Sequence, residues 1–258
     1  MFLGLIYAAG KAFTCLRGFL ENKRSALIND FLRLWKREVL VLGDSHVKGF
    51  SYLDSHLPRG YFLNLLSVSG ATASGLSNPR SKTRASTRFR RELKRSRAVL
   101  IVIQLGEVDT GFVVWWRAKK YNNSVEVMLE STVKNYLSLL EEAKLVSGVV
   151  ICVSAPLPTI KDGAPNGTVA QHRCEIDASQ KERTELTVKF NAMVEDGAIK
   201  LGVEYLNLDI DSMGEDRLVA NWLLNRDAGD HHYCPLSYSK LLKRRLNPLI
   251  LKALVGSK

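Results

Sequence analysis

The stretch of sequence that decides the fold is EVLVLGDSH, which runs from Glu38 to His46. Four of its first five residues are apolar and do not alternate with polar ones, and they lead directly into a Gly-Asp-Ser turn. This pattern predicts a buried strand followed by a turn and a helix. Because strands buried on both faces are typical of parallel sheets, we expect such a sheet, with this turn at its ligand-binding edge.

Four similar apolar runs predict four further strands, over Phe62–Val68, Ala98–Leu105, Val149–Ser154 and Val203–Leu208. Between them, apolar residues recur every three or four positions, most clearly over Ser124–Leu145 and Ser179–Leu201, and this spacing predicts helices. The sequence therefore predicts an α/β protein, a three-layer α/β/α sandwich around a five-stranded parallel sheet with right-handed crossovers. Two irregular stretches, residues 155–177 and 225–235, are expected to form loops over the strand ends.

An N-terminal extension, residues 1–36, is expected to precede the main domain, residues 37–258. Apolar residues at helical spacing between Phe2 and Trp35, interleaved with Lys and Arg, predict two amphipathic helices. These helices either pack on the domain or lie on an anionic membrane surface. The uncharged opening, residues 1–10, is too short to span a bilayer and fits a signal peptide poorly.

The cysteines bear on the cellular compartment. Four widely spaced cysteines in a chain of 258 residues do not make the framework of a small disulfide-rich protein. They are Cys15, Cys152, Cys174 and Cys234. We therefore expect reduced thiols and an intracellular protein, either free or peripheral at a membrane.

The positive charge of the chain is concentrated in one segment. The 37 Lys and Arg against 26 Asp and Glu give a net charge of +11, and nine of the positive residues lie between Arg80 and Arg97. The segment is either a solvated helix face or a patch for an anionic polymer or membrane surface, with Arg84, Arg88, Arg90 and Arg91 as its expected core. Specific binding of nucleic acid is disfavoured, because Phe89 is the only aromatic residue in the run.

Ser45 is the first candidate for chemistry. It stands where a strand gives way to a helix, so its hydroxyl and backbone N–H would face the ligand edge. Gly, Asp and Ser are also ordinary turn and cap residues, so the tripeptide alone decides little. A nucleophilic serine needs a base and an orienting carboxylate. His231 and His232 stand beside Asp230 in a polar loop before the last predicted helix, where they could supply both.

These residues resemble the SGNH hydrolases, also called GDSL-type esterases and lipases. The resemblance extends over residues 38–246 and rests on four blocks in order, namely VLGDS at 41–45, VSGAT at 68–72, LGEVD at 105–109 and DHHYCP at 230–235. It implies the flavodoxin-like fold of that superfamily and an esterase mechanism. It also implies that Ser45 is the nucleophile and that the backbone N–H groups of Ser45 and Gly70 bind the oxyanion.

The fourth block departs from the Asp-x-x-His pattern of the family. Alignment on the proline that follows selects His232 as the base and Asp230, two residues earlier, as its partner, with His231 and Asp227 as the fallback pair. The third block departs as well. Val108 occupies the position of the family's asparagine, whose side-chain amide is an oxyanion donor, and its neighbours Glu107 and Asp109 are expected to contact substrate.

Two functional hypotheses follow from the residues and the resemblance. The first is a serine esterase or acyltransferase acting on O-acyl groups, O-acetyl among them, of a carbohydrate or glycan. The second is a catalytically weakened protein of the same fold that binds an anionic glycan or membrane surface. The sequence leaves the oligomeric state open.

A zinc site is a weaker alternative. His172 and Cys174 in one loop, and His231, His232 and Cys234 in the other, offer enough imidazole and thiol, but their spacings match no regular zinc motif. We expect neither a metal nor a cofactor.

Overall fold

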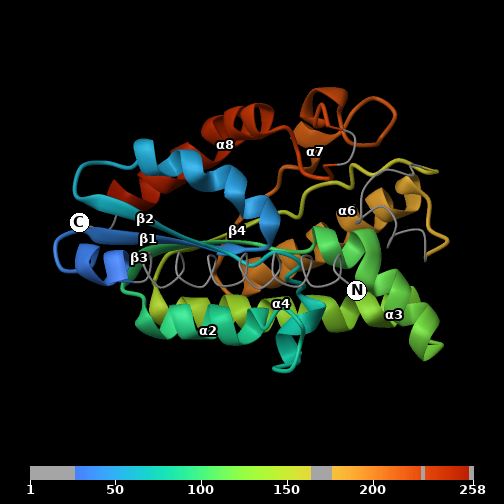
Figure 1. Cartoon of the computed structure of the whole chain (residues 1–258), viewed down its shortest axis with the longest axis horizontal. Helices are drawn as coiled ribbons and strands as arrows, with labels where there is room; N and C mark the ends of the chain where they lie inside the picture. Colours follow the sequence, from blue (N-terminus) through green and yellow to red (C-terminus); the bar gives the residue numbers. More distant parts are fainter. Residues whose placement is uncertain (1–26, 164–175, 228–229, 256–258) are drawn as a thin grey trace, which may run out of the picture.

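Five parallel strands form one sheet in the order β2-β1-β3-β4-β5, and helices cover both of its faces (Figure 1). The computed structural model describes residues 27–163, 176–227 and 230–255. The strands are β1 (Arg37–Gly43), β2 (Tyr61–Ser67), β3 (Ala98–Gln104), β4 (Val150–Val153) and β5 (Glu204–Leu206). The predicted three-layer architecture and its five strands are confirmed.

α-Helices, 3₁₀ helices and a π-helix connect or follow the strands. The α-helices are α2 (Ala85–Arg95), α3 (Val114–Tyr121), α4 (Val125–Val146), α6 (Gln180–Lys200), α7 (Asp209–Ser212) and α8 (Pro235–Val255). The 3₁₀ helices are η1 (Ser45–Ser55), η2 (Ser74–Ser77) and η4 (Asn221–Leu223). The helix η3 (Asp109–Val113) is a π-helix. Local capping explains where the two long predicted helices begin, because Ser124 and Ser179 each accept a hydrogen bond from the first turn.

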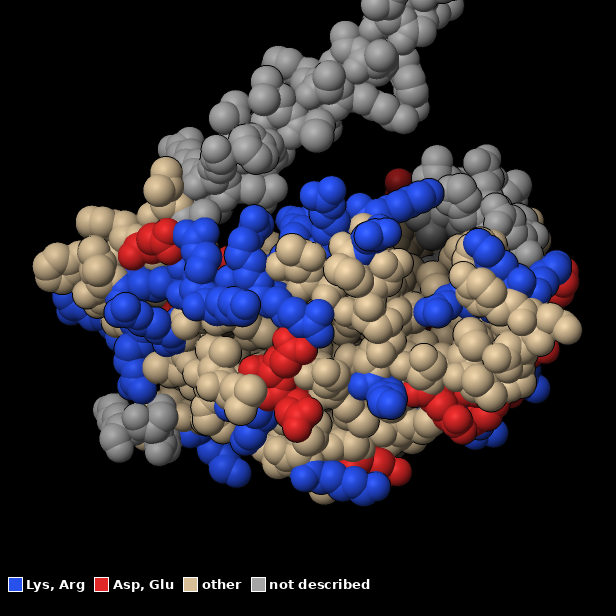
Figure 2. Space-filling view, turned by 90° about the horizontal axis from the view of Figure 1, so that it is seen from below, with Lys and Arg blue, Asp and Glu red and all other residues tan. Residues whose placement is uncertain are grey.

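The basic segment forms α2 and the turn before it. Figure 2 shows Lys and Arg side chains gathered over this helix. Within the predicted patch, Arg84 and Arg91 are exposed, whereas Arg88 and Arg90 are half-buried. The helix is amphipathic, since Phe89 and Leu93 on its other side are buried. The charge of this segment therefore stands on one outer face of the protein.

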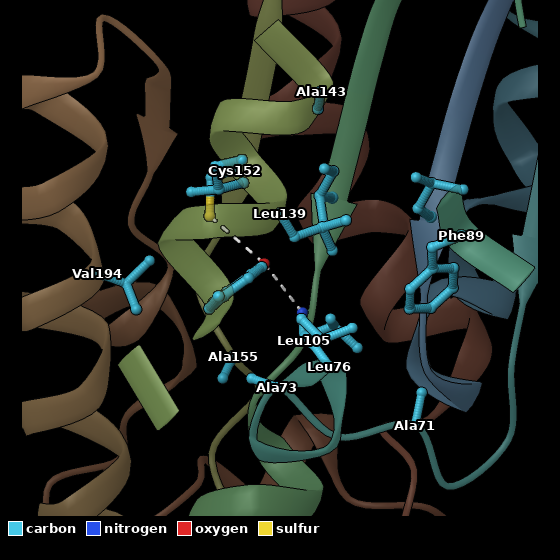
Figure 3. Packing of buried hydrophobic residues seen from close by; sticks show 14 of the residues in the cluster. Ala71, Ala73, Leu76, Phe89, Leu105, Leu139, Ala143, Cys152, Ala155 and Val194 are labelled. Atoms are coloured by element: carbon cyan, nitrogen blue, oxygen red, sulfur yellow. Dashed lines mark hydrogen bonds between the residues drawn. The ribbon is translucent and has the colours of Figure 1, made fainter. Parts of the chain in front are cut away.

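Two hydrophobic clusters, one on each side of the sheet, make the core. Alternate residues of β1 enter them, Leu40 and Leu42 on the side of α2, α4 and α6, and Val39 and Val41 on the side of η1 and α8. Figure 3 shows part of the first cluster, where the hydroxyl of Tyr136 accepts a hydrogen bond from the backbone of Leu105. Burial on both faces explains why the strands read as unbroken apolar runs.

Of the extension, the described part begins at residue 27, and residues 27–32 are helical. The rest of the two predicted N-terminal helices lies outside the described residues, as do Cys15, His172 and Cys174 and most of the loop predicted over 155–177. Cys152 and Cys234 carry free thiols. No helix among the described residues combines the length and the apolar character needed to cross a bilayer.

Glu38 joins the extension to the sheet. Its buried carboxylate accepts two hydrogen bonds from Arg33, at 3.0 and 2.7 Å, and others from the side chains of Asn64 and Ser96 and the backbone of Arg97. Burial alone would raise the pKa of Glu38, but these hydrogen bonds outweigh it and lower that pKa. The first residues of β1 therefore carry a buried ionic network.

Replacing Glu38 by alanine is expected to lower the free energy of unfolding by about 3–5 kcal/mol, because Arg33 would then keep a buried charge without this partner. Urea denaturation followed by circular dichroism measures the change. The control is Glu126→Ala, which removes an exposed ion pair with Lys189 and should cost less than about 1 kcal/mol. Equal losses in the two variants would contradict a special role for Glu38.

Candidate active site

Ser45 lies at the carboxyl end of β1, where η1 begins. The strand must make a close turn here, because a Cβ atom on Gly43 would lie 2.3 Å from both the carbonyl oxygen of Gln104 and the side chain of Val47. Asp44 then caps η1, its carboxylate accepting the backbone N–H of His46 at 2.8 Å. Gly43 and Asp44 together fix Ser45 at the start of a helix, where the sequence predicted it.

His232 contacts both Ser45 and Asp230. Its Nε2 lies 2.7 Å from the hydroxyl oxygen of Ser45, and its Nδ1 lies 2.6 Å from a carboxylate oxygen of Asp230. In the tautomer with the proton on Nδ1, the ring donates to Asp230 and accepts from the Ser45 hydroxyl. This is the connectivity that a Ser-His-Asp triad requires.

The spacing of Asp230 and His232 has a local explanation. The carboxylate oxygen that contacts the ring also accepts the backbone N–H of His232 at 3.0 Å, so the carboxylate folds back over two residues. Asp44 and His46 adopt the same arrangement, with ring nitrogen and carboxylate 2.9 Å apart. An aspartate two residues before a histidine can therefore orient it. Asp227, from the fallback pair, supplies its backbone carbonyl to the N–H of Asp230.

The loop that carries His232 is held by one hydrogen bond within the loop and by two from the loop after β4. Asn225 donates to the second oxygen of Asp230 at 2.9 Å. From the loop after β4, the backbone N–H of Leu157 donates to the Tyr233 hydroxyl at 2.7 Å, and the Thr159 hydroxyl donates to the carbonyl of His231 at 2.6 Å. Sequence reasoning missed the two hydrogen bonds from the loop after β4, since they join segments more than 70 residues apart in the chain.

Asp230 is ionised in this setting. Burial alone would raise its pKa, but hydrogen bonds from the backbone and ring of His232 lower that pKa below its usual range. A carboxylate in this state can stabilise the imidazolium that forms when His232 accepts a proton.

The second block lies next to Ser45. The backbone N–H of Val68 donates to the carbonyl of Gly43 at 2.9 Å, and the Ser67 hydroxyl donates to the carbonyl of Asp44 at 2.8 Å. Gly70, in the turn that follows, has a φ of +69°, a conformation that favours glycine. The turn predicted to supply an oxyanion donor therefore follows two residues that bond the carbonyl groups of Gly43 and Asp44, immediately before Ser45.

Glu107 and Asp109 are the two residues predicted to contact substrate, and both have buried side chains. Asp109 accepts the backbone N–H groups of Ala73 and Ser74, at 2.7 and 2.9 Å, and thereby holds the second block against the third. Burial raises the pKa of Asp109 to about 6, against the effect of these hydrogen bonds.

His46 is a further residue of the site that the sequence did not reveal. Its Nε2 lies 4.0 Å from the carboxylate of Glu107, and its ring centroid lies 4.7 Å from that of His232. His46 therefore stands between two buried carboxylates and beside the ring that contacts Ser45. The signal was its position next to Ser45, which the turn into η1 brings to the same edge.

A metal ion could in principle use the imidazoles of this site. His46, His231 and His232 each offer one nitrogen, and these atoms lie within 4.8 Å of one another. Both ring nitrogens of His232 already face Ser45 and Asp230, however. A cation bound here would displace His232 from Ser45 and would oppose a serine mechanism.

A cavity of about 610 Å³ opens beside Ser45, between η1 and the start of α8. Its wall combines aromatic, hydroxyl and charged side chains with the residues that contact one another at the site. They are Ser45, His46, Lys48, Gly49, Ser51, Tyr52, Asp230, His232, Tyr233, Pro235, Leu236, Tyr238 and Ser239. Its volume lies within the range of pockets that bind small molecules.

The fold of the chain is similar to that of several solved structures. A GDSL-like lipase from Bacteroides thetaiotaomicron matches with a TM-score of 0.58 and 18% identity, over 84% of this chain and 89% of that chain. A catalytic mutant of an acetylxylan esterase from Geobacillus stearothermophilus matches with a TM-score of 0.50 and 12% identity, over 82% and 94%. The chain has the SGNH-hydrolase fold. No protein-family model matches the sequence, and a comparison with curated protein sequences finds no match.

Val108 marks the main departure from the SGNH pattern. It lies half-buried directly before η3, where an asparagine is expected to donate to an oxyanion, and its side chain offers no donor. In an SGNH site of this kind the oxyanion would rest on two backbone N–H groups, those of Ser45 and Gly70.

Replacing Val108 by asparagine is expected to raise kcat for a short aryl ester by up to about 10²-fold, because it supplies the third donor. Steady-state kinetics on purified wild-type and variant proteins measures the change. The control is Val113→Asn, at a half-buried position at the other end of η3, which should leave kcat unchanged. An unchanged rate for Val108→Asn would argue against an oxyanion position beside residue 108.

The strand ends beneath the site are joined through Asn191. Its side chain bonds both the N–H and the carbonyl of Ala155, at 2.8 and 3.1 Å, and donates to Asp209 at 2.7 Å. Burial raises the pKa of Asp209 to about 7, partly offset by the hydrogen bond from Asn191. In the unfolded chain an aspartate has a pKa of about 3.9.

Between these two pKa values the folded protein binds a proton that the unfolded chain has lost, so Asp209 makes stability fall as the pH rises. Asp209→Asn is expected to reduce this slope by up to about 1.4 kcal/mol per pH unit between about pH 4 and 7. Urea denaturation at a series of pH values measures it. The exposed Asp196→Asn should keep the wild-type slope, and an unchanged slope in Asp209→Asn would refute the assignment.

Proposed function

We propose that the chain is a serine esterase that removes O-acyl groups, O-acetyl among them, from a carbohydrate. The observation that carries this proposal is the unbroken line of contacts from Ser45 through His232 to Asp230 at the wall of a cavity. The SGNH-hydrolase fold, shared with enzymes that act on esters, supports the same reaction class.

The reaction would proceed in two halves. The Ser45 oxygen attacks the ester carbonyl while His232 takes the hydroxyl proton, and the backbone N–H groups of Ser45 and Gly70 bind the oxyanion. The carbon–oxygen bond to the alcohol then breaks, and His232 returns the proton to that alcohol. Water, deprotonated by His232, attacks the acyl-serine and releases the acid and free Ser45. Asp230 orients the ring throughout.

The shape and lining of the cavity support a carbohydrate ester. An acetyl group alone would leave most of the 610 Å³ unfilled, so the remainder can hold the alcohol part of the substrate. Tyr52 and Tyr238 offer aromatic surface, and Ser51 and Ser239 offer hydroxyl groups, a mixture suited to a sugar ring. One structural neighbour is an acetylxylan esterase.

Two variants of the proposal use the same site. A sugar hydroxyl in place of water would accept the acyl group and make the protein an acyltransferase. Val108 favours a second function, in which weak catalysis accompanies binding of an anionic surface, because one oxyanion donor is absent from its usual position. An assay that measures both the acid released and the acyl group transferred to an added sugar alcohol distinguishes the esterase from the acyltransferase.

Labelling with a fluorophosphonate probe tests the proposed nucleophile. The probe should phosphonylate Ser45 with loss of fluoride, and labelling should disappear in Ser45→Ala and fall by at least about 10³-fold in His232→Ala. Hydrolysis of acetyl esters of monosaccharides, followed as acetate release, should fall in parallel.

Controls separate these residues from their neighbours. Ser138→Ala, at an exposed position of α4, should label as wild type. Asp230→Asn should slow the reaction by about 10²–10⁴-fold, whereas Asp227→Asn should not. Labelling that persists in Ser45→Ala, or a wild type that neither labels nor hydrolyses any acetyl ester, would overturn the esterase proposal.

A further inference from the structure

The described part of the N-terminal extension, from residue 27, is attached to the domain by its polar side. The side-chain amide of Asn29 donates to Asn64 at 2.7 Å, and Arg33 bonds both Glu38 and Glu92 at 2.7 Å. Asp30 pairs with Arg33 and, in a short contact, with Arg95 of α2. Polar side chains thus fix residues 27–33 over the end of α2, the start of β1 and the middle of β2.

The apolar side of the same segment faces outward. Leu27, Phe31, Leu34 and Trp35 are 71%, 63%, 69% and 77% exposed, and Ile28 is exposed as well. Their spacing of three and four residues places Leu27, Phe31 and Leu34 on one side. A helix on a globular protein ordinarily buries its apolar side and exposes its polar side. This segment does the opposite, because its polar side contacts the domain. We refer to Leu27, Ile28, Phe31, Leu34 and Trp35 as the apolar ridge.

A basic groove adjoins the apolar ridge. It has a volume of about 460 Å³ and is lined by Pro79, Ser86, Thr87, Arg90, Arg91, Lys94 and Arg95. Arg95 belongs to this wall and also pairs with Asp30, which lies within the helical segment that carries the ridge. Figure 2 shows how densely Lys and Arg cover the surface at α2.

One side of the basic groove contains an arginine whose side chain is fixed by its neighbours. Arg90 is held in place by Glu142, at 2.7 Å, and by the Ser86 hydroxyl. Arg91 and Lys94 are exposed at its wall, where they can reach an anion together with the hydroxyl of Thr87. Guanidinium, ammonium and hydroxyl donors in one groove match the oxygens of a phosphate group.

We propose that this face binds an anionic membrane, with the apolar ridge entering the interfacial layer and the basic groove taking a lipid phosphate. An apolar ridge beside a basic groove favours a membrane over other anionic partners. A polysaccharide or nucleic acid would use the positive charge but would leave five apolar side chains in water, whereas a bilayer surface offers both anionic headgroups and an apolar layer. The proposal does not depend on the esterase function.

Vesicle co-sedimentation of the full chain tests the proposal. Vesicles of phosphatidylcholine with phosphatidylserine should bind the protein, binding should weaken as salt rises, and vesicles of phosphatidylcholine alone should bind it far less. The double variant Arg91→Glu with Lys94→Glu should weaken binding by about tenfold or more. Lys181→Glu with Lys200→Glu, on α6, changes the net charge equally and should bind as wild type.

The apolar ridge has its own test. Leu34→Ser with Trp35→Ser should weaken vesicle binding, and because both positions are exposed, circular dichroism should show the variant folded. Tryptophan fluorescence of the wild type should shift to shorter wavelength on adding anionic vesicles, and Trp35→Phe should remove most of that shift. Both results would support insertion of the ridge.

Several outcomes would overturn the proposal. One is no binding to anionic vesicles while heparin retains the protein, since the groove would then serve a polymer. Another is vesicle binding that the variants of α6 weaken as much as those of α2. A third is self-association that Leu34→Ser with Trp35→Ser abolishes without any vesicle binding, because the ridge would then bind a second copy of this chain.

Discussion

The proposed chemistry depends on one hydrogen bond, between the Ser45 hydroxyl and Nε2 of His232. These residues are 187 positions apart in the chain, so the bond exists only because α8 packs against η1 on the same face of the sheet. That packing is close, since a Cβ atom on Gly49 would lie 2.7 Å from the ring of Tyr238. Tyr238 in turn bonds the buried Gln104 of β3. Tyr238 therefore joins the wall of the cavity to the buried part of the sheet.

The sequence predicted the parts of this site that have a local cause. Unbroken apolar runs mark strands buried on both faces, and the turn after β1 follows from Gly43, which no larger residue could replace. The choice between His231 and His232 was less secure, because neither has an aspartate three residues before it. The structure accounts for the selected pair: one oxygen of Asp230 contacts both the backbone and the ring of His232, a geometry that needs a separation of two.

What the sequence could not predict are contacts between distant segments. Asp109 follows β3 and was expected to meet substrate, yet it is buried because the N–H groups of Ala73 and Ser74 need an acceptor there. Glu107 was likewise expected to contact substrate, and its buried carboxylate lies 4.0 Å from Nε2 of His46. The sequence around a carboxylate that follows a strand does not show whether the side chain faces solvent or packs against another loop. The reversed orientation of the N-terminal segment has the same cause, since Glu38 and Glu92 draw Arg33 inward.

The polarity of the parallel sheet separates the two ends of the molecule. Arg33 contacts Glu38 near the start of β1, and Ser45 lies two residues after the last residue of the same strand. Seven residues of strand span about 23 Å. The ionic network that holds the N-terminal segment and the nucleophile of the proposed esterase site therefore stand at opposite ends of β1, and variants of one can be made without touching the other.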